Sequence, residues 1–168
     1  MSGDDYQKFL LALVMWREAR GSGLAGMRAV GHSIRNRVNK FAKTYSQIIL
    51  QPWQYSSMTA FKSIKKVVEE REAMKAVPLP KDFIERHSND LIGDSQLGVW
   101  PFDGDLHDFY QVILLANAIY DGSDNPDFVE GATHYFAASM IKGNGTGLPE
   151  WAKSMRFVKS VGGHDFYI

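Results

Sequence analysis

The sequence predicts a mainly α-helical (α+β) fold with a small β element, formed by 168 residues as a single domain. Four long stretches, 5–20, 24–40, 60–77 and 105–121, carry apolar residues at the spacing of a helix. Beyond the last of them the pattern changes, and 132–137 and 164–167 suit short strands. A chain of this length can bury one hydrophobic core, so we expect the helices and the strands to share it.

The first predicted helix, 5–20, is apolar on nearly every face, with Leu13 and Trp16 at helical spacing. A helix without a polar face is buried on all sides, so this one should lie at the centre of the core. Gly21 and Gly23 follow it and are expected to end it.

Further elements follow along the chain. The stretch 24–40 is amphipathic and predicts a second helix. A short helix is expected at 44–50, followed by a loop at 51–56. The stretch 60–77 also has helical spacing and a charged face, and it runs into a proline-containing segment, so we predict a helix there.

The composition limits the partners. Nineteen basic residues balance nineteen acidic ones, so no net charge favours nucleic acid or an anionic membrane. The chain has no cysteine, which excludes disulfides, thiolate zinc sites and cysteine nucleophiles. The apolar run 10–16 is too short to span a bilayer, and the first five residues are acidic where a signal peptide is basic. We therefore expect a soluble monomer without membrane insertion and without an export signal of its own.

Glu18 is the strongest catalytic candidate. It shares a helix face with the apolar Val14 and Met15, and it lies at the C-terminal end of the predicted helix. Burial and the helix dipole both favour the protonated form there, whereas Arg17 and Arg20 would favour the charged form if they come close. A neutral glutamic acid in an apolar cleft can give a proton to the leaving oxygen of a glycosidic bond. The alternative is a structural salt bridge between Glu18 and an arginine.

Aromatic residues outside the helices are a second indication. Sugar rings stack on aromatic faces, and sugar hydroxyls bond to the polar tips of tyrosine and tryptophan, so such a set suits a glycan-binding groove. Ordinary packing in the core is the alternative for each of them. The set comprises Trp53, Tyr55, Trp100, Tyr135, Phe136, Trp151, Phe166 and Tyr167.

The five histidines do not follow the spacing of a metal site such as His-Glu-x-x-His, so we expect neither a metal nor another cofactor. His134 and His164 lie in the predicted β segments, where they could orient a substrate or Glu18. A structural role is the alternative for both. No phosphate-binding loop, nucleophilic serine motif or dinucleotide fingerprint occurs.

Five sequence blocks follow one another in the order of a known enzyme family. They are Glu18-Ala19-Arg20-Gly21 with Gly26, Ala29-Val30 with Asn36-Arg37-Val38, Gln54-Tyr55-Ser56, Asp127 with Gly131-Ala132-Thr133-His134-Tyr135-Phe136, and Trp151 with Gly163-His164-Asp165-Phe166-Tyr167. Together they resemble the SleB-type cell wall hydrolases, which include spore-cortex-lytic enzymes and endolysin-like relatives encoded by phages. The matches cover about 6–56 and 106–168, so 57–105 resembles an insertion. Ser22 and Val129 depart from the family pattern, in which an acidic residue and a threonine are common.

The resemblance implies a lysozyme-like, mostly α fold and cleavage of the bond between N-acetylmuramic acid and N-acetylglucosamine in peptidoglycan. It implies Glu18 as general acid and base, either of a lytic transglycosylase or of a muramidase. Hydrolysis would need a second group to activate water, for which Asp127 is the candidate. The residues expected to bind the glycan are Gln54, Tyr55, Ser56, Thr133, His134, Tyr135, His164 and Tyr167.

Other functions fit parts of the sequence. A non-catalytic glycan-binding protein or a phage structural protein could keep the same scaffold, although the presence of Glu18 argues against it. A metal-dependent amidase would cut the peptide stem of peptidoglycan, but the metal spacing is missing. For an enzyme that acts at the cell wall without its own leader, we expect release through a phage-made pore or by accessory secretion.

Overall fold

The computed structural model describes residues 2–61, 76–93, 103–139, 141 and 147–168. At its centre lies helix α1 (Gly3–Ala19), which begins with a capping box. The Ser2 side chain accepts a hydrogen bond from the Asp5 backbone N–H, and the Asp5 carboxylate accepts one from the Ser2 N–H. Every residue from 10 to 16 is buried, so α1 is enclosed on all sides, as its sequence predicts.

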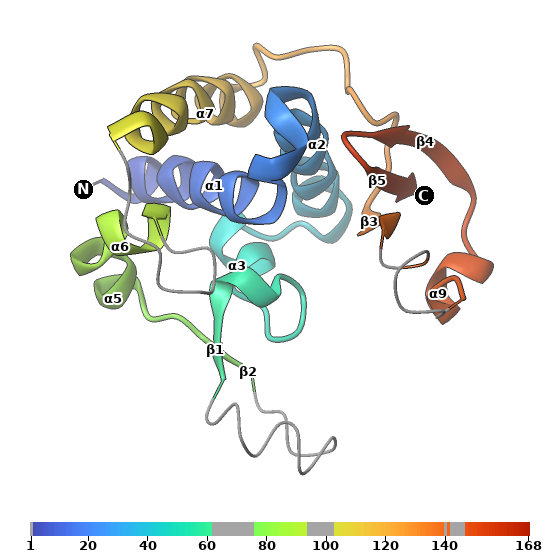
Figure 1. The fold of residues 1–168 in the computed structure, drawn as a ribbon, viewed down its shortest axis with the longest axis horizontal. Helices are drawn as coiled ribbons and strands as arrows, with labels where there is room; N and C mark the ends of the chain where they lie inside the picture. The colour runs from blue at the N-terminus through green and yellow to red at the C-terminus, as the bar shows by residue number, and fades with distance from the viewer. Residues whose placement is uncertain (1, 62–75, 94–102, 140, 142–146) are drawn as a thin grey trace.

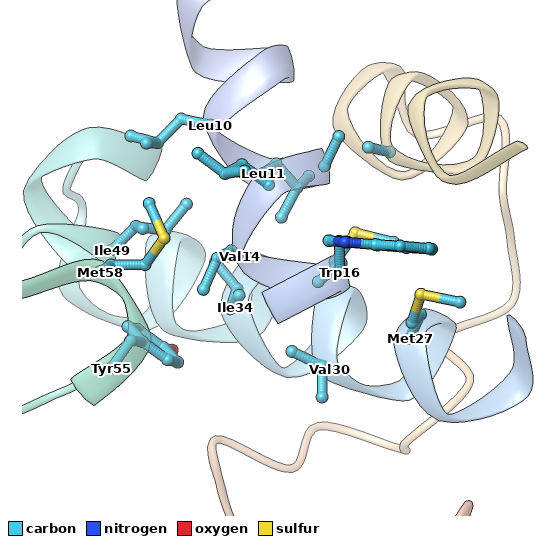
Figure 2. Close-up of a cluster of buried hydrophobic side chains, with 14 of the residues drawn as sticks. Leu10, Leu11, Val14, Trp16, Met27, Val30, Ile34, Ile49, Tyr55 and Met58 are labelled. Atoms are coloured by element: carbon cyan, nitrogen blue, oxygen red, sulfur yellow. The ribbon is translucent and has the colours of Figure 1, made fainter. Parts of the chain in front are cut away.

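Three helices pack around α1, namely α2 (Gly23–Phe41), α3 (Tyr45–Ile49) and α7 (Asp103–Asp121) (Figure 1). Figure 2 shows apolar side chains of α1 beside Ile34 of α2 and Met58. Gly31 allows the helices to approach closely, because a Cβ at this position would lie 2.7 Å from Ile119 Cδ1 and 2.8 Å from Met15 Sδ. A single core therefore joins the N-terminal helices to α7.

The C-terminal residues form a small antiparallel sheet beside α2 (Figure 1). Its strand order is β3 (His134–Ala137), β5 (His164–Tyr167) and β4 (Phe157–Val161). Tyr135 of β3 lies opposite Phe166 of β5. Phe166 is fully buried in the main core, whereas Tyr167 packs with Phe136 and Ala152 in a smaller cluster at helix α9 (Glu150–Lys153). Phe166 thus joins the sheet to the helical body, and Tyr167 joins it to α9.

The other described elements are short: 3₁₀ turns at Arg20–Ser22 and Ser56–Met58, β1 (Thr59–Phe61), β2 (Ala76–Pro78), α5 (Lys81–Arg86) and α6 (Ser88–Gly93). Strands β1 and β2 form a separate two-stranded sheet that extends away from the helical body (Figure 1). Within the described parts of the chain, none of the helices combines the length and apolar character needed to cross a membrane.

The structure confirms the mainly α fold with a small β element, and it contains three of the four long predicted helices, those at 5–20, 24–40 and 105–121. The predicted helix at 60–77 is wrong where the structure describes it, because 59–61 and 76–78 are paired antiparallel strands. The residues between them, 62–75, lie outside the described residues. Helical spacing is a local signal, whereas this pairing joins residues far apart in the chain, which a periodicity argument cannot detect.

Candidate active site

A cleft of about 540 Å³ lies where the C-terminal end of α1 meets the C-terminal sheet. This volume falls among pockets that hold small ligands, about 300–1,000 Å³. Its walls come from α1, α2, the loop before the second 3₁₀ turn, β3, α9 and β5. The lining residues are Glu18, Arg37, Trp53, Gln54, Tyr55, Thr133, His134, Tyr135, Phe136, Ala137, Trp151 and His164.

Glu18 lies in the last turn of α1, half-buried at the cleft. Its Oε1 accepts a hydrogen bond from the Ser57 hydroxyl, and its Oε2 accepts one from the Tyr135 hydroxyl at 3.2 Å. Among the described residues, no basic side chain forms an ion pair with Glu18, so the salt-bridge alternative does not describe this group. A hydroxyl can donate to a carboxylate or accept from a carboxylic acid. Both contacts can therefore persist when Glu18 gains or loses a proton.

Arg17, the residue before Glu18, fixes the segment that carries Ser57. Its Nε donates to the Ser57 carbonyl at 2.7 Å, and its Nη1 donates to the Leu91 carbonyl at 2.6 Å. Trp16 Nε1 likewise donates to the Ile92 carbonyl at 2.8 Å. The end of α1 is thus tied to two other segments by charge-assisted or buried hydrogen bonds, which hold the Ser57 hydroxyl against Glu18.

Two tyrosines line the cleft beside Glu18, the buried Tyr55 and the partly buried Tyr135. Burial raises the pKa of Tyr135 well above its ordinary value, and the neighbouring Glu18 carboxylate raises it further. Burial also raises the pKa of Tyr55, an effect that the nearby Arg37 cation opposes. Both phenols therefore keep their protons across the physiological range, and Tyr135 remains a hydrogen-bond donor to Glu18.

Two histidines stand beside these tyrosines. The His164 ring lies edge-on to Tyr135, with 5.5 Å between ring centroids, and its Nδ1 lies 3.4 Å from the Ser22 hydroxyl. The His134 Nδ1 lies 3.0 Å from the Thr133 hydroxyl. Burial lowers the pKa of His164, and burial together with the nearby Arg37 lowers that of His134. Both imidazoles are therefore neutral near pH 7.

Two indoles flank the cleft. Trp151 stacks obliquely on His134, with 5.2 Å between ring centroids. Trp53 is 56% exposed and has a left-handed backbone, with φ of 69°. A bulky residue in this conformation is unusual and occurs mostly where the surroundings enforce it, often at functional sites. Exposed aromatic faces at a polar cleft suit the stacking of sugar rings.

The structure brings together most of the residues that the sequence predicts for the site. Seven of them line the cleft: Glu18, Gln54, Tyr55, Thr133, His134, Tyr135 and His164. Tyr167 is not among the lining residues, because it packs in the small cluster at α9. The side chain of Ser56 and the whole of Trp100 lie outside the described residues. Phe166 is fully buried in the main core and is not among the residues that line the cleft.

Trp53, Phe136 and Trp151, which belong to the aromatic set expected to suit a glycan groove, also line the cleft. Sequence reasoning missed three residues at the site, namely Arg37, Ala137 and Ser57. Ser57 directly follows the block Gln54-Tyr55-Ser56, and Arg37 and Ala137 lie within or next to other family blocks. Spacing alone could not show which of these side chains turn towards Glu18.

Asp127, the sequence candidate for activating water, supports a turn instead of lining the cleft. Its carboxylate accepts hydrogen bonds from Asn36 Nδ2 at 2.9 Å and from the Val129 backbone N–H at 3.0 Å. It also lies 3.5 Å from Nδ1 of the fully buried His32, whose Nε2 lies 2.8 Å from Asp124. These contacts anchor the turn that leads into β3 and so help to place Tyr135.

The two cleft histidines predict a loss of stability in weak acid. Their folded-state pKa values lie below the ordinary 6.5, so the unfolded chain binds protons more readily. Their contribution is therefore fully present above pH 6.5 and is lost as the pH falls through the folded values. We expect the melting temperature to fall between pH 7.5 and pH 5, and to fall less in the double variant His134→Gln/His164→Gln. Equal pH dependence in both proteins would contradict this.

A family model for cell wall hydrolases matches residues 21–167, a span that begins just after Glu18. No curated protein matches the chain. Among solved structures, the catalytic domain of the germination-specific lytic transglycosylase SleB from Bacillus anthracis is similar, with a TM-score of 0.50 and 19% identity over 100% of this chain and 97% of that one. At this identity the likeness shows a shared fold. Because the family model spans most of the sequence, this chain belongs to the cell wall hydrolase family, whose members degrade peptidoglycan.

Proposed function

We propose that this chain cleaves the glycan strands of peptidoglycan between N-acetylmuramic acid and N-acetylglucosamine, with Glu18 as both general acid and general base. One observation carries the proposal. The Glu18 carboxyl lies in a cleft of about 540 Å³ with aromatic walls, and its partners there are the neutral hydroxyls of Ser57 and Tyr135. A carboxyl in that setting can release and recover a proton beside a bound sugar.

The reaction that fits this site has two proton transfers through one group. Glu18 first gives its proton to the glycosidic oxygen, and the bond from that oxygen to the anomeric carbon of muramic acid breaks. The electron pair leaves with N-acetylglucosamine, which departs with a free 4-hydroxyl. The Glu18 carboxylate then takes the proton of the muramic acid 6-hydroxyl, whose oxygen attacks the anomeric carbon. The product is a 1,6-anhydromuramyl end, and Glu18 is protonated again.

The residues around the cleft favour this lytic transglycosylase course over hydrolysis. Glycoside hydrolases usually need a second carboxylate about 5–9.5 Å from the acid, either as nucleophile or to activate water. Among the lining residues that the structure describes, Glu18 is the only carboxylate. Asp127 is occupied by Asn36 and by backbone N–H groups in the turn before β3. An intramolecular attack by the 6-hydroxyl needs neither water nor a second acid.

Mass spectrometry of the fragments released from purified cell walls tests the proposal. We expect muramyl ends that are one water lighter than the reducing ends left by hydrolysis. Reducing muramyl ends would overturn the transglycosylase course and keep glycan cleavage. Reducing N-acetylglucosamine ends would overturn the bond assignment. New amino termini on free stem peptides, lost when a chelator is added, would show a metal-dependent amidase instead.

A further inference from the structure

Arg37 is a cation at the cleft that the proposed reaction does not use. It lies on α2 and lines the cleft with Glu18 and Tyr55. Its Nη1 donates a long hydrogen bond, 3.4 Å, to the Thr133 carbonyl, and its guanidinium lies 5.8 Å from the centre of the Phe41 ring. Its buried Nε has no hydrogen-bond partner among the described residues. None of the ion pairs among those residues includes Arg37.

The contrast with Arg28 on the same helix is informative. Arg28 meets Asp124 through two hydrogen bonds of 2.8 and 2.7 Å, the paired geometry that a guanidinium and a carboxylate prefer. Arg37 offers the same planar set of donors with no described carboxylate to receive them. A buried N–H without an acceptor costs about 1–3 kcal/mol. A neutral side chain at this position would avoid that cost, so the retention of an arginine at the cleft points to a use of its charge there.

The charge of Arg37 also acts inside the cleft. After burial, it is the main cause that lowers the pKa of His134, and it opposes the rise that burial causes at Tyr55. These two side chains come from β3 and from the loop before the second 3₁₀ turn. The positive field therefore reaches both walls, where it would attract an anionic group of a bound ligand.

We propose that Arg37 binds a carboxylate on the 3-O-lactyl arm of muramic acid and thereby fixes which sugar is placed next to Glu18. This inference rests on the proposed glycan cleavage. N-acetylglucosamine carries no charge, whereas muramic acid carries a carboxylate on this arm, either the free lactyl group of stripped glycan or an acidic residue of the attached peptide. A guanidinium beside the cleft distinguishes the two sugars by this group.

The test measures kcat/KM on two glycans that differ in this charge. One is peptide-stripped glycan with free lactyl carboxylates, and the other is the same glycan after carbodiimide coupling to neutral methylamides. For the natural protein we expect a loss of about 10- to 100-fold on the neutral glycan, as for a hydrogen bond to a charged group. Arg37→Gln should lower kcat/KM on the charged glycan by the same factor, and its kcat/KM on the neutral glycan should equal that of the natural protein. Arg37→Lys should restore part of the kcat/KM that Arg37→Gln loses on the charged glycan.

Controls separate this inference from folding and from the proposed function. Arg86→Gln removes an exposed arginine on α5 that pairs with Asp82, so its kcat/KM should match the natural protein on both glycans. Thermal unfolding must show that Arg37→Gln is folded. If the natural protein cuts both glycans equally, the role of Arg37 is overturned and glycan cleavage stands. If it cuts neither, both proposals fall. A further arm uses peptide-bearing strands whose stem carboxylates have been amidated. If kcat/KM falls only in this arm, Arg37 binds a carboxylate of the peptide, and binding of the free lactyl carboxylate is overturned.

Discussion

Replacing Glu18 with glutamine should leave a folded protein whose lysis of purified cell walls is reduced by about 100- to 10,000-fold. Glutamine has the size of glutamate, and its amide can still bond to the hydroxyls of Ser57 and Tyr135. It cannot deliver a proton to the glycosidic oxygen or take one from the 6-hydroxyl. Glu18 serves both steps and is the only carboxylate among the described lining residues, so no other carboxylate there can take over its role. The measurement is the rate at which the turbidity of a cell wall suspension falls.

Glu85→Gln is the matched control for this experiment. Glu85 lies on α5, away from the cleft residues, and pairs with Lys81 at the surface. An exposed pair of this kind contributes about 0.3–0.5 kcal/mol, so both activity and melting temperature should stay near those of the natural protein. Unimpaired lysis by Glu18→Gln would refute the catalytic assignment. A melting temperature far below that of Glu85→Gln would instead show that position 18 is structural.

Replacing Phe166 with alanine should cause the largest loss of stability among the aromatic residues of the sheet. Phe166 is fully buried at the centre of β5, opposite Tyr135 and 5.4 Å from its ring centre. Removing a buried phenylalanine costs about 3–5 kcal/mol, because the surroundings fill the cavity only in part. For a chain of this length each kcal/mol lowers the melting temperature by about 2–4 °C, so we expect a fall of about 6–20 °C. Calorimetry or circular dichroism on heating measures it.

The neighbouring strand offers a matched control for this change. Phe157 of β4 pairs with Tyr167 in the same sheet but is 50% exposed. Phe157→Ala should therefore cost well under half as much as Phe166→Ala. Equal losses would mean that the sheet loses stability through its edges rather than through the core. Activity should also fall in Phe166→Ala at temperatures where it is folded, because Tyr135 loses the ring that packs against it.

The parts of the fold that depend on local pattern follow from the sequence. Helix α1 shows this, because its run of apolar residues from 10 to 16 is buried throughout. The strands β1 and β2 show the opposite, since Phe61 and Ala76 pair across a long stretch of chain. Strand β4 has too few apolar residues at regular spacing to stand out, and its partner strand decides its structure. The resemblance also predicts that residues 57–105 are an insertion, and this remains a prediction.

The sequence predicts which residues belong to the site, but it does not predict how their side chains are placed around the cleft. Glu18, Tyr135 and His164 follow from family blocks at both ends of the chain. Phe166 and Tyr135 look alike in sequence, as aromatic residues in short strands, yet only Tyr135 faces the cleft. The two residues lie directly opposite each other and therefore share one face of the sheet. They differ in position, because Phe166 lies on the central strand β5 and is covered by the core, whereas Tyr135 lies on the edge strand β3 and reaches Glu18. No local pattern fixes this difference.

The separation of Glu18 from Tyr135 and His164 along the chain has a consequence during translation, which proceeds from the N-terminus. A growing polypeptide that has passed residue 100 already contains the acid, but it has none of the C-terminal sheet against which a sugar would lie. If Glu18 is the acid, cleavage of peptidoglycan would thus become possible only after the C-terminal sheet has been made. A chain terminated before β3 should carry Glu18 but lack this activity.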